Sequence, residues 1–326
     1  MSHTDTTADE PQGSVFETEV VAEVSRTEQF KRFVREYIIA SFLIMWDNWR
    51  TRVGGLIILF YILLGTVGVR LIEEPGTSND RLVGAFETME YPLGTDNIGV
   101  DLLGAVVHAT PDMLIMISAG AVFTTVLATI VGTVSGYKGG RIDRVLSTIM
   151  DITMSIPGLP LVIVLAFILE PRNPAFVGIV VSVNAWAGLA RSIRSQVLTL
   201  RGEAYVEASR AMGILSTGII LKDVLPNLMP YILVNFTLSA RRVIIASVAL
   251  YFLGILPVSS YNWGFMLNQA YNSSGLYSLQ AVHWFLVPIV TIVLFIYGLV
   301  LFGQAADRLF NPQARVKHID TEARSE

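Results

Sequence analysis

Long, almost uncharged apolar segments recur along this 326-residue chain, and they constrain its fold more than any other feature. The hydrocarbon core of a bilayer is about 30 Å thick, so an α-helix needs about 20 apolar residues to cross it. Six segments meet or approach that requirement. They are residues 54–72, 113–137, 145–169, 175–190, 228–254 and 284–303. The sequence therefore predicts an all-α, polytopic membrane protein with six transmembrane helices.

The composition supports this interpretation and excludes several other classes. Hydrophobic residues make up 52% of the chain and charged residues only 15%, whereas soluble domains carry about 25% charged residues. A soluble protein of this size could not cover its surface with so few polar groups. The net charge of −4 also argues against nucleic acid as a partner.

Basic residues are distributed unevenly between the two sides that six crossings create. Eighteen of the 23 Lys and Arg residues lie in the N-terminal segment, in the loops 138–144 and 191–222, and in the C-terminal tail. Only Arg70, Arg81 and Arg172 lie in loops on the other side. Because basic residues concentrate in cytoplasmic loops, both termini are expected in the cytoplasm.

The pattern also divides the chain into segments. Residues 1–28 are polar and acidic and predict a disordered cytoplasmic tail. Residues 29–50 mix basic and apolar positions and predict an interfacial elbow helix, although an early, tilted start of the first span also fits. The other divisions are a transmembrane domain at 51–312, with an external acidic loop at 73–112, a cytoplasmic loop at 191–227 and an external loop at 255–283, and a cytoplasmic tail at 313–326.

Motifs for catalysis, nucleotide binding and metal binding are absent from the sequence. No segment fits the Gly-x4-Gly-Lys-Ser/Thr phosphate loop, so this chain is not expected to bind ATP or any other cofactor. There is no Cys, and the four His stand far apart, so neither a metal site nor catalytic residues are expected. Carboxylates within the spans are scarce, with Asp151 near the inner end of the third, which argues against a self-powered, proton-coupled carrier.

The cytoplasmic loop carries the clearest local pattern. Residues 203–212 predict a short surface helix, and Gly213 stands where a left-handed residue would end it. Ser216 or Thr217 can cap a second short helix, and Pro226 marks the return to the membrane. Small residues on the first helix allow another protein to approach closely, but a solvated amphipathic loop fits the same residues.

Two adjacent basic residues, Arg241 and Arg242, fall near the middle of the fifth span. A mid-bilayer Arg costs at least about 2.5–3.5 kcal/mol on insertion scales, so each needs water or a partner. Neighbouring helical residues point about 100° apart, so at least one is expected to face a water-filled pathway and a substrate carboxylate. An ion pair with Asp151 or with another subunit is the alternative.

The cytoplasmic loop resembles the Glu-Ala-Ala loop of binding-protein-dependent ABC transporter permeases, here as Glu207-Ala208-Ser209 followed by Gly213 and Leu225-Pro226. Other segments are similar to the second, C-type subunit of the dipeptide, oligopeptide and nickel permeases. These segments are Leu93-Gly94-Thr95-Asp96 with Gly99 and Asp101, Gly136-Tyr137-Lys138-Gly139-Gly140 with Asp143, Asp151 with Ile156-Pro157, Trp186, Ala190-Arg191 with Arg194, Gln196-Val197-Leu198, Tyr205-Val206, Leu225-Pro226-Asn227, Phe252-Leu253-Gly254 and Trp263-Gly264. Their order and spacing over about residues 50–312 make the resemblance specific.

The resemblance implies a multi-pass permease of the cell membrane with the fold of type I ABC importers. This chain would be half of a pore completed by a second permease subunit, driven by two ATP-binding subunits that hold ATP and Mg²⁺, and supplied by an extracellular solute-binding protein. The implied cargo is a peptide, with nickel and short oligosaccharides as alternatives. The residues implied in contact with the ATPase are Tyr205, Glu207, Ala208, Arg210 and Gly213.

The chain departs from the family pattern at five positions, which bear on substrate class and gating more than on fold. They are Ser209 in place of Ala, Asp223 in place of His, Val100 in place of Arg, Ser247 in place of Glu and Gln304 in place of Asp.

Two other classes of membrane protein are alternatives to the permease interpretation, and they differ in what they require. A stand-alone secondary carrier or channel would work without any ATPase, and an intramembrane hydrolase would need a nucleophile or metal constellation that the sequence lacks.

Overall fold

The computed structural model describes residues 49–258, 261–273 and 281–309, all of which belong to one unit of the chain, Ile44–Glu326. Within these residues the protein is helical, with two isolated β-bridges and no strand. The α-helices are α3 (Trp49–Leu63), α4 (Val69–Leu71), α5 (Leu102–Lys138), α6 (Gly140–Ser155), α7 (Gly158–Leu169), α8 (Pro174–Val181), α9 (Ala185–Leu200), α10 (Ala204–Ala211), α11 (Ser216–Ile219), α12 (Leu225–Phe252), α13 (Trp263–Asn272) and α14 (Val282–Leu309). Two π-helical turns, η2 (Leu64–Gly68) and η3 (Ile220–Val224), join α3 to α4 and α11 to α12.

The membrane-spanning helices agree with the all-α, six-span prediction. Four continuous helical segments, Trp49–Leu71, Leu102–Lys138, Ser216–Phe252 and Val282–Gln304, are long and apolar enough to cross a bilayer. Two bent pairs, α6 with α7 and α8 with α9, bring the number to six if each pair is one span. The tails 1–28 and 313–326 and nearly all of the expected elbow helix 29–50 lie outside the described residues. The side on which each terminus lies stays a prediction.

The second span begins earlier than the sequence suggests. The external loop expected at 73–112 ends at Asp101, because its carboxylate accepts hydrogen bonds from the amides of Leu103 (3.0 Å) and Gly104 (2.8 Å) and caps α5. Pro111 lies inside α5 without ending it. The helix continues unbroken to Lys138. Polar residues and a proline at 108–112 separate its apolar first turns from the longer apolar run that begins at Met113, and this interruption concealed the extension.

The third and fourth spans are both broken. Pro157 separates α6 from α7, and the two helices are bent by 85°, because a proline interrupts the helical hydrogen bonds. Helices α8 and α9 are bent by 61°. The fourth span, expected to end at residue 190, instead continues as α9 to Leu200. Arg191 and Arg194 do not end the helix, because each forms an ion pair with a carboxylate of α6.

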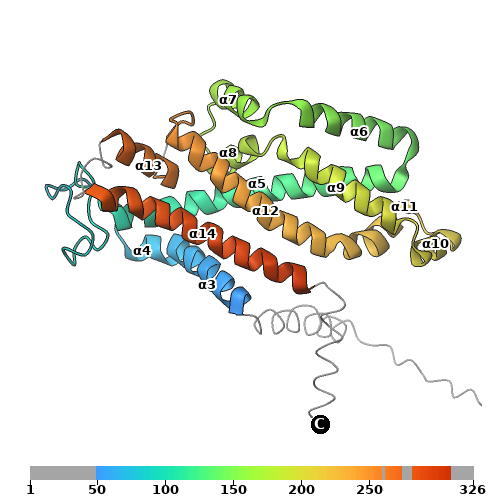
Figure 1. Cartoon of the computed structure of the whole chain (residues 1–326), viewed down its shortest axis with the longest axis horizontal. Helices are drawn as coiled ribbons and strands as arrows, with labels where there is room; N and C mark the ends of the chain where they lie inside the picture. Colours follow the sequence, from blue (N-terminus) through green and yellow to red (C-terminus); the bar gives the residue numbers. More distant parts are fainter. Residues whose placement is uncertain (1–48, 259–260, 274–280, 310–326) are drawn as a thin grey trace, which may run out of the picture. The chain divides into compact units, whose positions relative to one another are not determined.

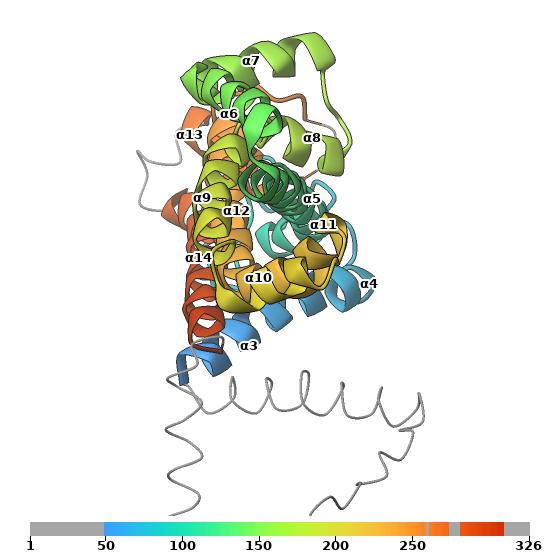
Figure 2. The ribbon, with the colours of Figure 1, turned by 90° about the vertical axis from the view of Figure 1, so that its right-hand side faces the viewer.

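Helix α5 is central to the packing, since α8, α9 and α12 all contact it, while α14 contacts both α3 and α12. Figure 2 shows α6 and α7 on the opposite side of α5 and α9 from α3 and α14. Glycines allow the closest approaches. A Cβ atom at Gly132 would lie 2.6 Å from the carbonyl oxygen of Ala190, and one at Gly178 would lie 2.1 Å from that of Met116. Small residues therefore permit close packing of membrane helices at these positions.

The segment Leu93–Asp96, which the family resemblance singled out, forms a tight turn ahead of α5. Gly94 has a φ of +82°, a conformation that favours glycine. The carboxylate of Asp96 accepts a hydrogen bond of 2.8 Å from the amide of Val100. A ring nitrogen of His283 lies 3.0 Å from the carbonyl oxygen of Thr95, so the turn is also joined to the start of α14. The motif is thus a structural anchor for the loop.

Gly132→Ala is expected to lower the free energy of unfolding by about 1–3 kcal/mol, because the added methyl group overpacks the contact between α5 and α9. Gly188→Ala is the matched control, since a Cβ atom there meets nothing within 4 Å, and alanine favours the helix by up to about 1 kcal/mol. Thermal unfolding of the purified chain in detergent measures both variants. Equal shifts of the two midpoints would contradict the close contact.

Candidate functional site

The short helix predicted at 203–212 is present as α10, with Glu203 at its N-cap and Met212 at its C-cap. Gly213 follows with a φ of +75°, the left-handed conformation expected of it. The next helix, α11, starts at Ser216 with Leu215 at the N-cap and no side-chain cap. The prediction that Ser216 or Thr217 caps it was therefore wrong: Ser216 is already the first residue of the helix, and Thr217 the second.

Helix α10 buries one face and leaves the other open. Val206 and Ser209 are buried, and Val206 belongs to the same apolar cluster as Ile219 and Val224. The exposed positions of α10 and the turn after it include all five residues implied in ATPase contact, namely Tyr205, Glu207, Ala208, Arg210 and Gly213. Ser209, where the chain departs from the family pattern, faces the protein and leaves the open face unchanged.

The open side of this loop also carries apolar groups that the sequence pattern did not single out. Met212 is 71% exposed and Leu215 is 78% exposed. Both flank Gly213, so they extend the exposed face of α10 around the turn. Polar and charged groups on α10 beside apolar groups on the turn are a composition typical of protein interfaces.

A hydrogen bond connects α10 to the start of α12. The side-chain amide of Asn227 donates to the Tyr205 hydroxyl at 3.3 Å and to the carbonyl oxygen of Asp223 at 2.7 Å. Partial burial raises the pKa of Tyr205, and the carboxylates of Glu203 and Asp223 raise it further, so the phenol stays neutral at physiological pH. Two residues from separate motifs of the resemblance thus meet in one contact.

A bidentate ion pair joins two further motifs. Arg194 on α9 donates from Nε to Oδ1 of Asp143 at 2.6 Å and from a terminal nitrogen to Oδ2 at 2.7 Å. The hydroxyls of Ser135 and Ser147 also donate to Oδ1 of Asp143, at 2.5 Å and 3.2 Å. The end of α5, the start of α6 and the middle of α9 are therefore held together just before the loop that contains α10.

Asp151 lies apart from the pair of arginines on α12. Its carboxylate forms an ion pair with Arg191 on α9, and both side chains are about half exposed. Among the described residues, neither Arg241 nor Arg242 forms an ion pair with Asp151, which is paired with Arg191 instead. Whether Asp151 also faces a substrate pathway stays a prediction.

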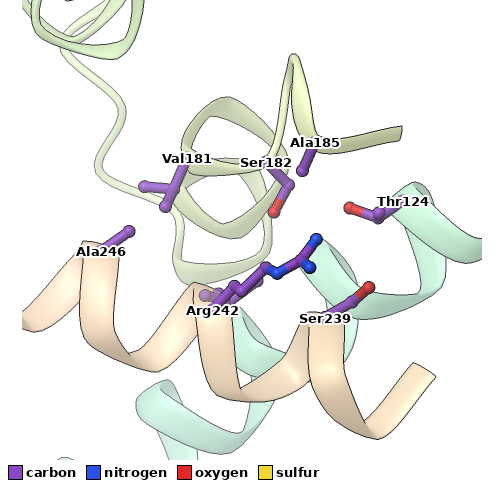
Figure 3. Close-up of a pocket in the computed structure, with 8 residues that line it drawn as sticks. Thr124, Val181, Ser182, Ala185, Ser239, Arg242 and Ala246 are labelled. Carbon is purple, nitrogen blue, oxygen red and sulfur yellow. The ribbon is translucent and has the colours of Figure 1, made fainter. Parts of the chain in front are cut away.

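Arg241 and Arg242 occupy different environments. Arg241 is half-buried, and its Nε atom is buried without a hydrogen-bond partner among the residues that the structure describes. Arg242 is exposed and lines a small cavity between α5, α8, α9 and α12. Figure 3 shows the Arg242 side chain extending into this cavity beside the hydroxyl groups of Thr124 and Ser182. The residues that line it are Thr124, Val181, Ser182, Ala185, Ser239, Arg242, Val243 and Ala246.

The described part of the chain contains no group of three or more His, Cys, Asp or Glu side chains placed to hold a metal ion. This part of the chain contains two candidate sites at different positions along the helix axes. One is the exposed face of α10, and the other is the cavity at Arg242. Figure 1 shows α10 and α11 at the opposite end of the helices from α13 and the segment 73–101.

Comparison with known proteins identifies the class. The pattern of the family described as "Binding-protein-dependent transport system inner membrane component" matches residues 128–316, more than half of the chain. The chain belongs to this family of inner membrane components of binding-protein-dependent transport systems.

Individual relatives and one solved structure agree with this assignment. The oligopeptide transport system permease protein OppC of Haemophilus influenzae is 30% identical over 275 residues, covering 82% of this chain and 86% of that protein. OppC of Bacillus subtilis strain 168 is 29% identical over 265 residues, covering 80% and 85%. A structure of the MetNI methionine ABC transporter in an inward-facing conformation has a similar fold, with a TM-score of 0.50 at 21% identity, covering 63% of this chain and 94% of that one.

A double-mutant cycle tests the Asp143–Arg194 ion pair. Asp143→Asn and Arg194→Gln are expected to show a coupling of about 1–3 kcal/mol in the free energy of unfolding, because the charges are bidentate and partly buried. The control cycle, Asp151→Asn with Arg191→Gln, should give less than about 1 kcal/mol, because that pair is exposed. Denaturation of the purified chain in detergent measures both. A larger coupling for the exposed pair would contradict the assignment.

Proposed function

We propose that this chain is a permease subunit of an ATP-driven importer in the cell membrane and forms half of the translocation pathway for peptides. A second permease subunit forms the other half, and an extracellular solute-binding protein delivers the peptide. Support for peptides comes from the relatives, which include the oligopeptide permease OppC and the dipeptide permease DppC of Bacillus subtilis. Their similarity extends over four fifths of this chain.

The open face of α10 is the observation that carries the proposal. The sequence contains no phosphate-binding loop, so energy has to enter through a partner that binds ATP and Mg²⁺. Helix α10 offers Tyr205, Glu207, Ala208 and Arg210 to such a partner, and Gly213 fixes the turn that follows. Two ATPase subunits would then be needed, one for each permease subunit.

The connections of α10 suggest how motion of the ATPase reaches the pathway. Helix α9 runs directly into the loop that contains α10, and α10 packs on α11 and η3, which continue into α12. Both α9 and α12 contribute residues to the cavity at Arg242. When the ATPase subunits close on ATP, displacement of α10 would tilt α9 and α12 together and change which side of the pathway is open.

A stand-alone carrier is a weaker fit to the same residues. Proton-coupled carriers use carboxylates within the membrane. Helices α8, α9 and α12 carry none, and α5 carries only Asp112, in its third turn. The exposed face of α10 would also have no partner protein in a stand-alone carrier. Both features favour a subunit that is driven by another protein.

Glu207→Lys and Gly213→Val are each expected to abolish peptide uptake and co-purification of the ATPase subunit, while membrane insertion stays normal. The first reverses a charge in the contact, and the second forces a β-branched residue into a left-handed conformation. Glu90→Lys, the same charge reversal at an exposed position in the segment 73–101, should leave ATPase co-purification unchanged. Uptake in cells that lack the native permease, together with affinity purification from membranes, measures both effects.

Normal uptake by both variants would refute the docking role of α10. Peptide transport by the purified chain in liposomes without any ATPase would refute the importer assignment itself and favour the stand-alone carrier. Uptake that needs all subunits and is lost with either α10 variant would support the proposal.

A further inference from the structure

The cavity at Arg242 combines one cation with several hydroxyl groups. Thr124 on α5, Ser182 after α8 and Ser239 on α12 all line it, and all three side chains are buried. Figure 3 shows the guanidinium group of Arg242 extending toward the part of the cavity lined by Ser182 and Thr124. The Ser182 hydroxyl donates to the carbonyl oxygen of Gly178 at 2.7 Å, which leaves the hydroxyls of Thr124 and Ser239 as donors beside the cation. A cation beside hydroxyl donors, within otherwise apolar walls, is a composition suited to a small anion.

Two of these groups lack a partner within the described part of the chain. The Thr124 hydroxyl is buried and makes no hydrogen bond. Arg242 makes no hydrogen bond or ion pair with any residue that the structure describes. Buried hydroxyls and mid-membrane guanidinium groups that stay unpaired are costly, so such groups mark places where a ligand or water supplies the missing contacts.

No carboxylate of this chain is placed to neutralise Arg242 from the helices that line the cavity. Asp112 is the one carboxylate on α5, α8, α9 and α12, and it lies 12 residues before Thr124 along α5, or about 18 Å at 1.5 Å per residue. Asp151, on α6, is already paired with Arg191. Arg242 itself is ten residues from the end of α12, about 15 Å along the helix axis and close to mid-membrane depth.

We propose that the cavity at Arg242 is a transient binding subsite for the carboxylate of a peptide passing through the importer. This inference rests on the proposed function. The guanidinium group of Arg242 donates to the carboxylate, and the Thr124 hydroxyl completes its hydrogen bonding. The cavity volume is about 70 Å³, room for a few water molecules or one carboxylate but not for a whole peptide. The rest of the peptide therefore stays in the pathway outside it.

The test compares uptake of trialanine and trialanine amide by the assembled importer in proteoliposomes, with ATP and the same solute-binding protein in every reaction. At subsaturating peptide, wild-type protein should transport the free acid about tenfold faster than the amide, after the uptake rates are divided by the solute-binding protein's own affinities for the two peptides. The reason is that the amide cannot form the charge-assisted contact with Arg242. Arg242→Gln should remove this preference. Arg241→Gln, which deletes the same charge one residue away, should keep it.

Further variants and one further peptide sharpen the result. Arg242→Lys should retain part of the preference. Thr124→Val should reduce it about fivefold, because the hydrogen bond of this hydroxyl to the carboxylate, which is stronger than the same bond to a neutral amide, is lost without a change of shape. An alanyl-glutamyl-alanine amide distinguishes the two sources of carboxylate. Uptake at the free-acid rate means that a side-chain carboxylate also binds, and uptake at the amide rate means that only the terminal one does. Both results support the subsite if Arg242→Gln removes the difference in uptake rate between the peptides that carry the bound carboxylate and trialanine amide.

Three outcomes would overturn the inference. An unchanged preference in Arg242→Gln would show that this residue does not meet the carboxylate. Equal loss of uptake for the acid and the amide in both Arg242→Gln and Thr124→Val would indicate that the cavity serves assembly, for example by pairing with the second permease. ATP-independent uptake, or none of either peptide by the wild type, would refute the proposed function and the subsite with it, so the two failures can be told apart.

Discussion

The close packing of α5 against α8 and α9 is the contact on which the rest of the structure depends. Lipid tails are as apolar as leucine side chains, so helices in a bilayer associate through short-range packing and polar contacts more than through the hydrophobic effect. Gly132 and Gly178 let the backbones come into contact. Arg194 and Asp143 then connect α9 to α6 at the end of this contact. The result is a rigid unit that ends where the loop with α10 begins.

This arrangement separates three tasks along the helices. At one end the segment 73–101 and α13 form the side on which the importer account places the solute-binding protein, and at the other end α10 offers an open face (Figure 1). Between them the Arg242 cavity lies where α5, α8, α9 and α12 meet. Helices α9 and α12 line the cavity and also connect to the loop that contains α10. A displacement of α10 would therefore move the residues that are proposed to bind the peptide carboxylate.

Sequence reasoning succeeded where a local signal fixes the structure. Gly213 and the residues before it predicted the bounds of α10 within one residue. A glycine directly after a short amphipathic segment commonly ends a helix in the left-handed conformation. Hydropathy alone predicted the four continuous spans and the two bent pairs that bring the number to six if each pair is one span. The start of α5 at Leu102 was missed because the polar residues and the proline at 108–112 interrupt the apolar pattern, whereas capping by Asp101 starts the helix before them.

The partners of charged and polar groups could not be predicted, because they depend on contacts between distant segments. Arg191 and Arg194 looked like the end of a span until their carboxylates on α6 were placed beside them. Arg241 and Arg242 have different environments, and the Thr124 hydroxyl has no hydrogen-bond partner within the described part of the chain. Both features depend on the contacts between α5, α8, α9 and α12. The periodicity of residues within one helix carries no information about contacts between separate helices.

Site-directed cross-linking tests the central claim, docking of the ATPase on α10, most directly. The chain contains no cysteine, so a single Cys at Ala208 is a unique probe in the middle of the open face. The account predicts that Ala208→Cys cross-links to the ATPase subunit in native membranes, with a yield that changes when ATP is added, and that Thr88→Cys, in the segment 73–101, does not. Labelling of Ala208→Cys by a membrane-impermeant reagent from outside the cell, with no cross-link to the ATPase, would contradict it.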